Sequence, residues 1–397
     1  MSNYFDTKNN PRKAYTGMLI IGIVAIVFPF IAANFGNSWV RILDFSLLYI
    51  MLALGLNIVV GFAGLLDLGY IAFYALGAYM AALLASPQFA VVLQSFVDTY
   101  PALGNFLVSV FGAEIAKNGI HLPVYVIVPL GAALAGLFGA LLGAPTLKLR
   151  GDYLAIVTLG FGEIIRIFMN NLNLPVNITN GPQGINDIDP VHIMGVSLAG
   201  EEGSHSTLHI LGFSMPSVNA YYFLFLLLCI AIIFITIRLQ NSRLGRAFVA
   251  IREDEIAAKA MGINTRNIKL LAFAMGASFG GVSGAMFATF QGFVSPESFS
   301  LTESIAVLSM VVLGGMGHIP GVILGAVLLT VFPEFLRYTV EPTQNFLLGK
   351  VLVPAESLRL LVFGIAMVAI MLVRPAGLWP SAVRRRELVV DGNGGEQ

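Results

Sequence analysis

Long stretches of apolar side chains most constrain what this chain can fold into. Residues 219–239, for example, contain only one charged side chain, Arg238, close to their end. A run of about 20 apolar residues matches the length of helix that crosses the hydrocarbon core of a membrane. These runs are too long and too continuous for barrel strands, which alternate over about ten residues. Only 11% of the residues are charged, whereas about 25% is usual in soluble proteins. The sequence therefore predicts an all-α polytopic membrane protein.

The apolar runs predict about ten transmembrane helices. They fall at residues 17–35, 40–60, 67–86, 122–147, 152–171, 219–239, 270–290, 302–315, 319–340 and 357–374. The eighth is short enough to be a broken or re-entrant element. The first follows a basic stretch, as a secretory signal does, but its length and its poor cleavage site favour a retained signal-anchor helix.

The distribution of basic residues predicts the orientation, because Lys and Arg collect in cytoplasmic loops. With the N-terminus inside, alternating spans place 16 of the 22 Lys and Arg residues on the cytoplasmic side. Residues 172–218 then lie outside and contain no Lys or Arg. We expect cytoplasmic tails at 1–16 and 379–397 on either side of a permease domain at 17–378. Residues 87–121 are also expected outside, and the sequence leaves two options for them, an extra pair of in-plane helices or membrane spans.

Five predicted spans precede residues 172–218 and five follow them. An odd number of spans in each half gives the two halves opposite orientations. This is the arrangement of an inverted 5+5 repeat, in which the transport path lies between the halves.

The largest predicted cytoplasmic loop, residues 240–268, lies in the most polar part of the chain. Residues 238–269 carry ten of the 44 charged side chains. Around Glu255, Ala257 and Ala258 the loop has helix-forming residues, and Gly262 is suited to end a helix. The small alanines would let a partner approach the backbone closely. Composition alone leaves a second interpretation open, in which this is a solvated helix without a partner.

Four polar residues within the predicted spans are candidates to line a transport path: Asn57, Thr158, Glu163 and Arg166. Polar and charged groups are costly inside a membrane and commonly mark a pathway. Glu163 and Arg166 are three residues apart on one predicted helix, so they either pair with each other or face water inside a bundle.

Several functional classes are not favoured. The formal net charge is zero, which argues against a nucleic-acid partner. The glycine cluster before His318 lacks the Lys-Ser/Thr ending of a phosphate-binding Walker motif and predicts a tight turn instead. His205 and His209 are four residues apart, but loop histidines of this kind are usually solvated, so no metal site is predicted. We find no arrangement of nucleophile and base, and we predict neither an enzyme nor a bound cofactor.

Four motifs resemble branched-chain amino-acid permeases of the ABC transporter class, and they occur in the family's order. They read GLNIVVGFAGLLDLGYIAFYALGAY at 55–79, LRGDYLAIVTLGFGEIIR at 149–166, NGPQGI at 180–185 and VLGGMGHIPG at 312–321. The segment around Ala257 is also similar to the degenerate "EAA" loop of ABC-importer permeases, although Glu255 is displaced by one position. The chain most resembles the larger, LivM-type subunit of such systems.

This resemblance implies a permease subunit that imports branched-chain or other hydrophobic amino acids across the bacterial inner membrane, surrounded by lipid. It implies a heterodimer with a second permease, two cytoplasmic ATPases that use ATP, and a periplasmic amino-acid-binding protein. Coupling to the ATPases would run through Glu255, Ala257, Ala258 and Gly262. Three alternatives remain at this stage: a permease for urea or other small amides, an ion-coupled secondary transporter, and a membrane-embedded enzyme, against which the lack of a catalytic arrangement in the sequence argues.

Overall fold

The computed structural model describes most of the chain between residues 24 and 348. The described residues are 22, 24–34, 36–146, 149, 151–193, 196–198, 207–210, 213–348, 361, 364, 365, 368, 372 and 377–379. The predicted N-terminal tail, most of the span at 357–374 and most of the C-terminal tail lie outside them. Every structural statement below concerns the described residues.

Five described helices are long and apolar enough to cross a membrane. They are α2 (Asn37–Asn57) with its π-helical continuation η2 (Ile58–Phe62), α7 (Val124–Thr146), α9 (Ser217–Gln240), α12 (Thr265–Gln291) and α14 (Ile319–Leu348). The helix α8 (Asp152–Asn171) follows α7 and carries several charges. Shorter apolar helices are Val24–Ala33, α3 (Ile71–Leu84) and α13 (Leu301–Gly314). The ten crossings, the cytoplasmic termini and the inverted repeat remain predictions.

Two of the expected spans are short helices of 14 residues each. The expected span at 67–86 is helical only from Ile71 to Leu84, because the chain leaves η2 through a non-helical segment at 63–70. The expected short span at 302–315 is α13, and a turn joins it to α14. A helix of 14 residues rises only about 21 Å, less than the hydrocarbon thickness of a bilayer.

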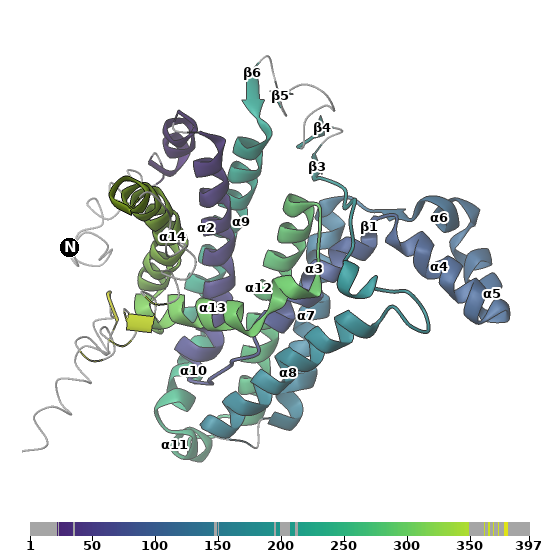
Figure 1. Cartoon of the computed structure of the whole chain (residues 1–397). Helices are drawn as coiled ribbons and strands as arrows, with labels where there is room; N and C mark the ends of the chain where they lie inside the picture. The colour runs from purple at the N-terminus through teal and green to yellow at the C-terminus, as the bar shows by residue number, and fades with distance from the viewer. Residues whose placement is uncertain are drawn as a thin grey trace, which may run out of the picture.

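The segment 87–121 forms short helices that lie to one side of the bundle, on the right of Figure 1. They are α4 (Gln88–Thr99), α5 (Pro101–Phe111) and α6 (Ala113–Asn118). Pro101 begins α5, where its missing N–H removes no helical hydrogen bond. The strands that bracket these helices, β1 (Ala85–Ser86) and β2 (Ile120–His121), pair antiparallel.

The segment 172–218 departs from the all-α prediction, since it contains two further antiparallel pairs. These are β3 (His192–Ile193) with β4 (Val196–Ser197), and β5 (Thr207–Ile210) with β6 (Phe213–Pro216). A short 3-10 turn, η3 (Gly181–Gln183), precedes them. Backbone groups in a loop need partners, and a loop that doubles back can supply them by local strand pairing. Apolar patterning does not reveal such short pairs.

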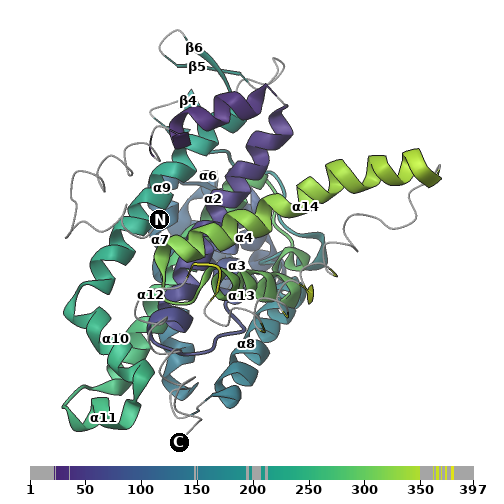
Figure 2. The same cartoon turned by 90° about the vertical axis from the view of Figure 1, so that its left-hand side faces the viewer.

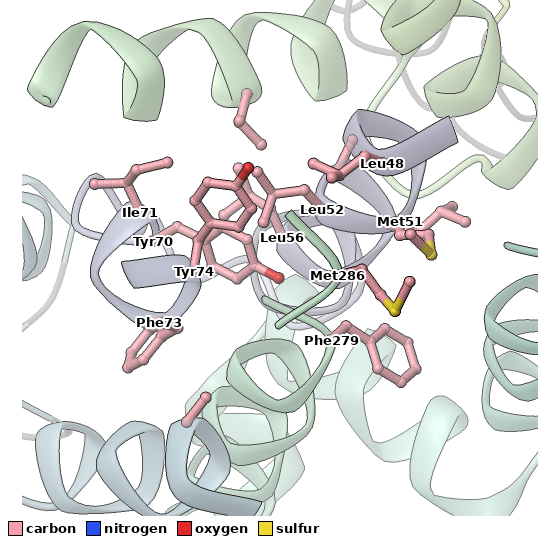
Figure 3. Packing of buried hydrophobic residues seen from close by; sticks show 14 of the residues in the cluster. Leu48, Met51, Leu52, Leu56, Tyr70, Ile71, Phe73, Tyr74, Phe279 and Met286 are labelled. Atoms are coloured by element: carbon pink, nitrogen blue, oxygen red, sulfur yellow. The ribbon is translucent and has the colours of Figure 1, made fainter. Parts of the chain in front are cut away.

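The core lies where α12 packs against α7, α3 and α2. Buried side chains from α2, α3 and α12 converge there, as Figure 3 shows for Leu56, Tyr74 and Met286. Glycines allow the backbones to touch: a Cβ atom on Gly77 would lie 2.2 Å from the carbonyl oxygen of Gly281. In the span formed by α2 and η2, 89% of an apolar stretch of 18 residues is buried, whereas only 33% of such a stretch is buried in α9. The helix α2 is therefore central and α9 is peripheral.

Two short helices, α10 (Arg243–Glu253) and α11 (Glu255–Ala260), connect α9 to α12. They lie together at the bottom of Figure 1 and remain there in the rotated view of Figure 2. We call this the α11 end of the molecule. At mid-height, the 3-10 turn η4 (Pro296–Phe299) leads from α12 into α13. Most of α14 extends away from the bundle in Figure 2.

Candidate functional site

The two helices α10 and α11 begin at polar caps that the sequence supplies. The hydroxyl oxygen of Ser242 accepts a hydrogen bond from the backbone N–H of Gly245 at 3.2 Å. The carboxylate of Asp254 accepts from the N–H groups of Ile256 at 2.7 Å and Ala257 at 3.0 Å. Such caps satisfy N–H groups that have no partner within the helix, and a negative charge is favourable at a helix N-terminus. Asp254 thereby fixes where α11 starts.

The end of α11 is set by Gly262, which confirms the predicted short helix and its glycine cap. Gly262 has a φ of +85°, a conformation that favours glycine. Its N–H donates to the carbonyl of Lys259 at 3.1 Å, and the N–H of Ile263 donates to the carbonyl of Ala258 at 3.1 Å. These two bonds form a Schellman motif, which satisfies carbonyls at the helix end. The chain then turns sharply into α12.

The capped helix presents small and apolar side chains to its surroundings. Ala258 faces inward and is buried, whereas Ala257 is exposed. Ile256 is 68% exposed and Met261 is 84% exposed. Single exposed apolar side chains also occur on surfaces that meet only water. Ile256 and Met261 therefore leave both interpretations of the loop open, and docking of a partner on α11 stays a prediction.

Glu255 lies on the inner side of α11 and makes an ion pair with Lys269 of α12. Its Oε1 atom is 2.7 Å from the ammonium nitrogen of Lys269, whose side chain is only 5% exposed. A nearly buried ammonium is costly to leave without an opposite charge. Glu255 therefore attaches α11 to α12, while Ala257 and Gly262 lie on the exposed side of the loop.

Arg252 attaches α10 to the end of the central helix α2. Its Nη1 atom donates to the carbonyl oxygen of Gly61, in η2, at 2.8 Å. The side-chain oxygen of Asn57, one turn earlier, accepts from the N–H of Gly317 at 2.8 Å. Gly317 belongs to the turn between α13 and α14, as expected for this glycine cluster. Polar contacts thus run from α10 through η2 to the α13–α14 turn.

Asn57 and Thr158, two of the pathway candidates, are buried in contacts between segments. The hydroxyl of Thr158 accepts from the N–H of Leu68 at 3.0 Å and donates to the carbonyl of Ala155 at 3.0 Å. It joins α8 to the segment 63–70, where a Cβ atom on Gly69 would lie 1.8 Å from the Thr158 carbonyl. Neither Asn57 nor Thr158 is exposed to solvent. The structure therefore gives both a packing role, and their pathway role stays a prediction.

Glu163 and Arg166, the other two candidates, form an ion pair on α8. The Nε atom of Arg166 donates to Oε1 of Glu163 at 3.0 Å. Arg166 also lies 3.7 Å from a carboxylate oxygen of Glu297 in η4. Both members of the pair are partly exposed. Glu163 lines a cavity of about 100 Å³ between α3, α8, η4 and α13, together with Ser304. The structure therefore confirms that Glu163 and Arg166 pair with each other, and their position on a water-filled path stays a prediction.

Lys269 and Arg252 were not among the sequence candidates, although both lie in the polar stretch at 238–269. Their partners are distant along the chain or belong to another element, so spacing alone does not indicate the pairs. The expected span at 270–290 begins directly after Lys269, so the sequence placed this ammonium in the loop, whereas α12 begins at Thr265 and contains it.

Comparison with known proteins agrees with this architecture. The family described as the branched-chain amino acid transport system permease component matches residues 38–371. Because this match covers most of the chain, the chain belongs to that family of membrane permeases. It includes the described helices from α2 to α14, with the α10–α11 loop and the cavity beside Glu163.

Individual relatives give the same result. The chain is 39% identical, over 381 residues, to the high-affinity branched-chain amino acid transport system permease protein LivM of Escherichia coli strain K12, which covers 94% of this chain and 77% of the relative. It is 26% identical to a probable LivM permease of Methanocaldococcus jannaschii, over 84% of this chain and 90% of the relative. A LivH permease of Salmonella typhimurium is 35% identical over 26% of this chain and 33% of its own length. No solved structure matches the chain.

Proposed function

We propose that this chain is the membrane permease subunit of an ATP-driven importer for branched-chain or other hydrophobic amino acids. The supporting observation is α11, a short capped helix that exposes Ile256 and Met261 and is tied inward through Glu255. The family membership and the names of the LivM relatives support the substrate class. The short match to a LivH permease supports a second, related permease as partner.

In this proposal, one of two cytoplasmic ATPase subunits binds α11, and the ATPase subunits use ATP. A displacement of α11 has two routes into the membrane helices. One is the Glu255–Lys269 ion pair to α12, and the other is the Arg252–Gly61 hydrogen bond to the end of α2. Since α2 and α12 form the core, their movement would change the contacts of the two permeases. A binding protein would deliver the amino acid on the opposite side.

The pathway would use partly exposed charges, because a zwitterionic amino acid needs opposite charges along its route. Glu163 and Arg166 meet this requirement, since they form a balanced pair beside the cavity near Ser304. Asn57 and Thr158 would contribute by holding the surrounding segments in place. Uptake should therefore be more sensitive to the loss of Glu163 than to the loss of other exposed acids.

The docking of α11 is tested by replacing Gly262 with tryptophan. No atom lies within 4 Å of a Cβ at Gly262, so the added side chain meets open space in this chain. The positive φ adds strain of about 1–2 kcal/mol, which a folded domain tolerates. We expect normal levels in the membrane, loss of ATPase co-purification, and loss of labelled leucine uptake.

Gly292 provides a matched control at the other end of α12. Its φ is +71° and a Cβ there also meets nothing within 4 Å. Gly292→Trp therefore introduces the same strain and the same bulk far from α11, and we expect ATPase binding to persist. Normal uptake in Gly262→Trp, or equal loss of ATPase binding in both variants, would contradict docking through α11.

The substrate and the energy source are tested in a deletion strain in which the gene is restored. Labelled leucine uptake should return, and unlabelled branched-chain amino acids should inhibit it while urea does not. Uptake should fail when the partner ATPases are inactivated and should survive dissipation of the proton gradient when ATP is maintained. Inhibition by urea would favour a small-amide permease, and uptake without the ATPases would favour a secondary transporter.

A further inference from the structure

A second cavity lies at the opposite end of the bundle from α11. It has a volume of about 420 Å³ and lies between the end of α3, the β1–β2 pair, the start of α7 and the end of α12. Thr289, which lines it, is 24 residues beyond the start of α12 at Thr265, or roughly 36 Å along the helix. We call this cavity the His121 pocket.

The pocket has a fixed frame. The N–H of Asp189 donates to the carbonyl of Ala85 at 2.6 Å, which attaches the external segment to the end of α3. On the other side, the hydroxyl of Tyr221 accepts from the N–H of Val191 at 3.0 Å and lies 3.2 Å from the carbonyl of Thr289, to which it donates. Since the aromatic ring of Tyr221 is buried, the wall is held before any ligand arrives.

The lining of the pocket includes the apolar side chains of Leu122, Val124, Ile127 and Val191. It also includes three titratable side chains, Asp189, His121 and His192, of which the first two form an ion pair. Sites for small ligands have volumes of about 300–1,000 Å³ and combine apolar walls with a few polar groups that fix orientation. This cavity has that composition.

Two hydrogen-bond acceptors face the imidazole of His121. Its Nδ1 atom faces a carboxylate oxygen of Asp189, and its Nε2 atom lies 2.9 Å from the carbonyl oxygen of Asn118. Both neighbours are acceptors, so both ring nitrogens must carry hydrogen to satisfy them. The hydrogen bond to Asp189 accordingly raises the pKa of His121 above 6.5. The His121–Asp189 pair therefore offers one positive and one negative group to a ligand in the pocket.

We propose that the His121 pocket binds a free aliphatic amino acid in its zwitterionic form. The ammonium group would bind the Asp189 carboxylate, the carboxylate would accept from Nδ1 of His121, and the aliphatic side chain would lie on Val124 and Ile127. Because the existing ion pair is partly exposed, its separation costs little free energy. The ligand then replaces one ionic contact with two. A ligand with a single charge would leave one of the two groups without a partner.

This inference rests on the proposed function for the identity of the ligand and for the orientation that places α11 in the cytoplasm. In that orientation the pocket opens on the side where a binding protein would release its cargo. The His121 pocket would then be the first site on the permease to bind the amino acid, and it is distinct from the cavity beside Glu163.

Direct binding to the full-length chain tests the proposal. The purified protein is placed in nanodiscs of phosphatidylglycerol, because the headgroup of this lipid has no ammonium. The binding of labelled leucine is then measured. We expect leucine to bind, whereas 3-methylbutylamine and isovalerate, which each keep one charge of leucine, compete at least tenfold more weakly. Asp189→Asn should weaken binding about tenfold, since the ammonium loses its charged partner. Val124→Trp should abolish binding by filling the pocket.

Two matched controls separate the pocket from general effects. Asp98→Asn removes an exposed carboxylate of α4 that is likewise in a hydrogen bond, and Val126→Trp adds the same bulk on α7 at a residue that does not line the pocket. Both should bind leucine like the wild type. Absence of leucine binding, or equal binding in Asp189→Asn, Val124→Trp and the controls, would overturn the proposal.

The same variants in the complete transporter separate this inference from the proposed function. If the wild type transports leucine and Asp189→Asn raises KM about tenfold with kcat unchanged, the result supports both the proposed function and the His121 pocket. If transport is normal in Asp189→Asn and Val124→Trp, the pocket is rejected and the function stands. If the wild type transports no leucine, the proposed function fails, and the binding measurement still decides on the pocket because it requires neither ATP nor partners.

Discussion

Replacing Glu255 with glutamine should loosen α11 without unfolding the bundle. The substitution keeps the size of the side chain and removes the charge opposite Lys269. It leaves the Asp254 cap and the Schellman motif intact. The expected change is therefore local: α11 separates more often from α12, while the packing of α12 against α7, α3 and α2 persists.

The magnitude follows from the burial of the two groups. A hydrogen bond to a charged group contributes about 1.5–3 kcal/mol, and the Lys269 side chain, 5% exposed, cannot exchange its lost partner for water. Glu255 is 28% exposed, so its carboxylate is already partly solvated. We therefore expect the free energy that holds α11 on α12 to fall by an amount in the lower half of this range, about 2 kcal/mol. This corresponds to roughly a 30-fold increase in the equilibrium constant for separation of α11 from α12.

Amide hydrogen exchange followed by mass spectrometry measures this opening. Peptides that cover α11 should exchange roughly 30-fold faster in Glu255→Gln, and peptides from the middle of α12 should not change. Glu253→Gln is the matched control, because it removes an exposed acid two residues earlier and should leave exchange unaltered. In a Lys269→Met background, Glu255→Gln should have a smaller effect than in the wild type, because the shared ion pair is already absent.

The reasoning would be refuted by an unchanged exchange rate in Glu255→Gln, or by the same increase in Glu253→Gln. Additive effects of Glu255→Gln and Lys269→Met would also contradict it, since two members of one pair must not act independently. Any of these results would mean that α11 is held by other contacts and that the first route into the membrane helices is absent.

Three further predictions concern the core and the far end of the molecule. Asn57→Leu should lower the stability by about 1 kcal/mol, seen as a lower Tm of the purified chain, because a backbone N–H in the α13–α14 turn loses its acceptor. Gly77→Leu should prevent accumulation of folded protein in the membrane, since its Cβ has no room, whereas Gly160→Leu, where nothing lies within 4 Å, should accumulate normally. An NMR titration should place the pKa of His121 above 6.5, and Asp189→Asn should return it toward 6.5. Because the folded-state pKa is raised, this pair stabilises the folded chain fully below pH 6.5 and loses that contribution as the pH rises through the folded-state value; a pKa at or below 6.5 would contradict the pairing.

The sequence predicted the helices whose limits are marked by local chemistry. The spans expected at 152–171 and 219–239 are α8 and α9, with ends within two residues, because polar or turn-forming residues flank each run. The short α11 and its cap at Gly262 were also predictable, since N-cap and C-cap preferences act within a few residues.

The candidate site was predicted in part. Glu163 and Arg166 were expected to pair because they are three apart on one helix, and the structure has this pair. Asn57 and Thr158 were expected only as polar residues within spans. Their actual partners, the N–H groups of Gly317 and Leu68, are 260 and 90 residues away, and a sequence contains no local signal for such a contact.

The sequence by itself determined the class of protein, because an apolar run of about 20 residues between charged loops has few folded states other than a membrane helix. It also determined the position of α11 and its cap at Gly262. Only the tertiary structure decided that Glu255 faces Lys269, that Arg252 reaches Gly61, and that His121 and Asp189 meet across 68 residues of chain. Those pairs depend on how α2, α3, α7 and α12 pack, and packing is fixed by the mutual fit of many surfaces, which apolar periodicity does not specify.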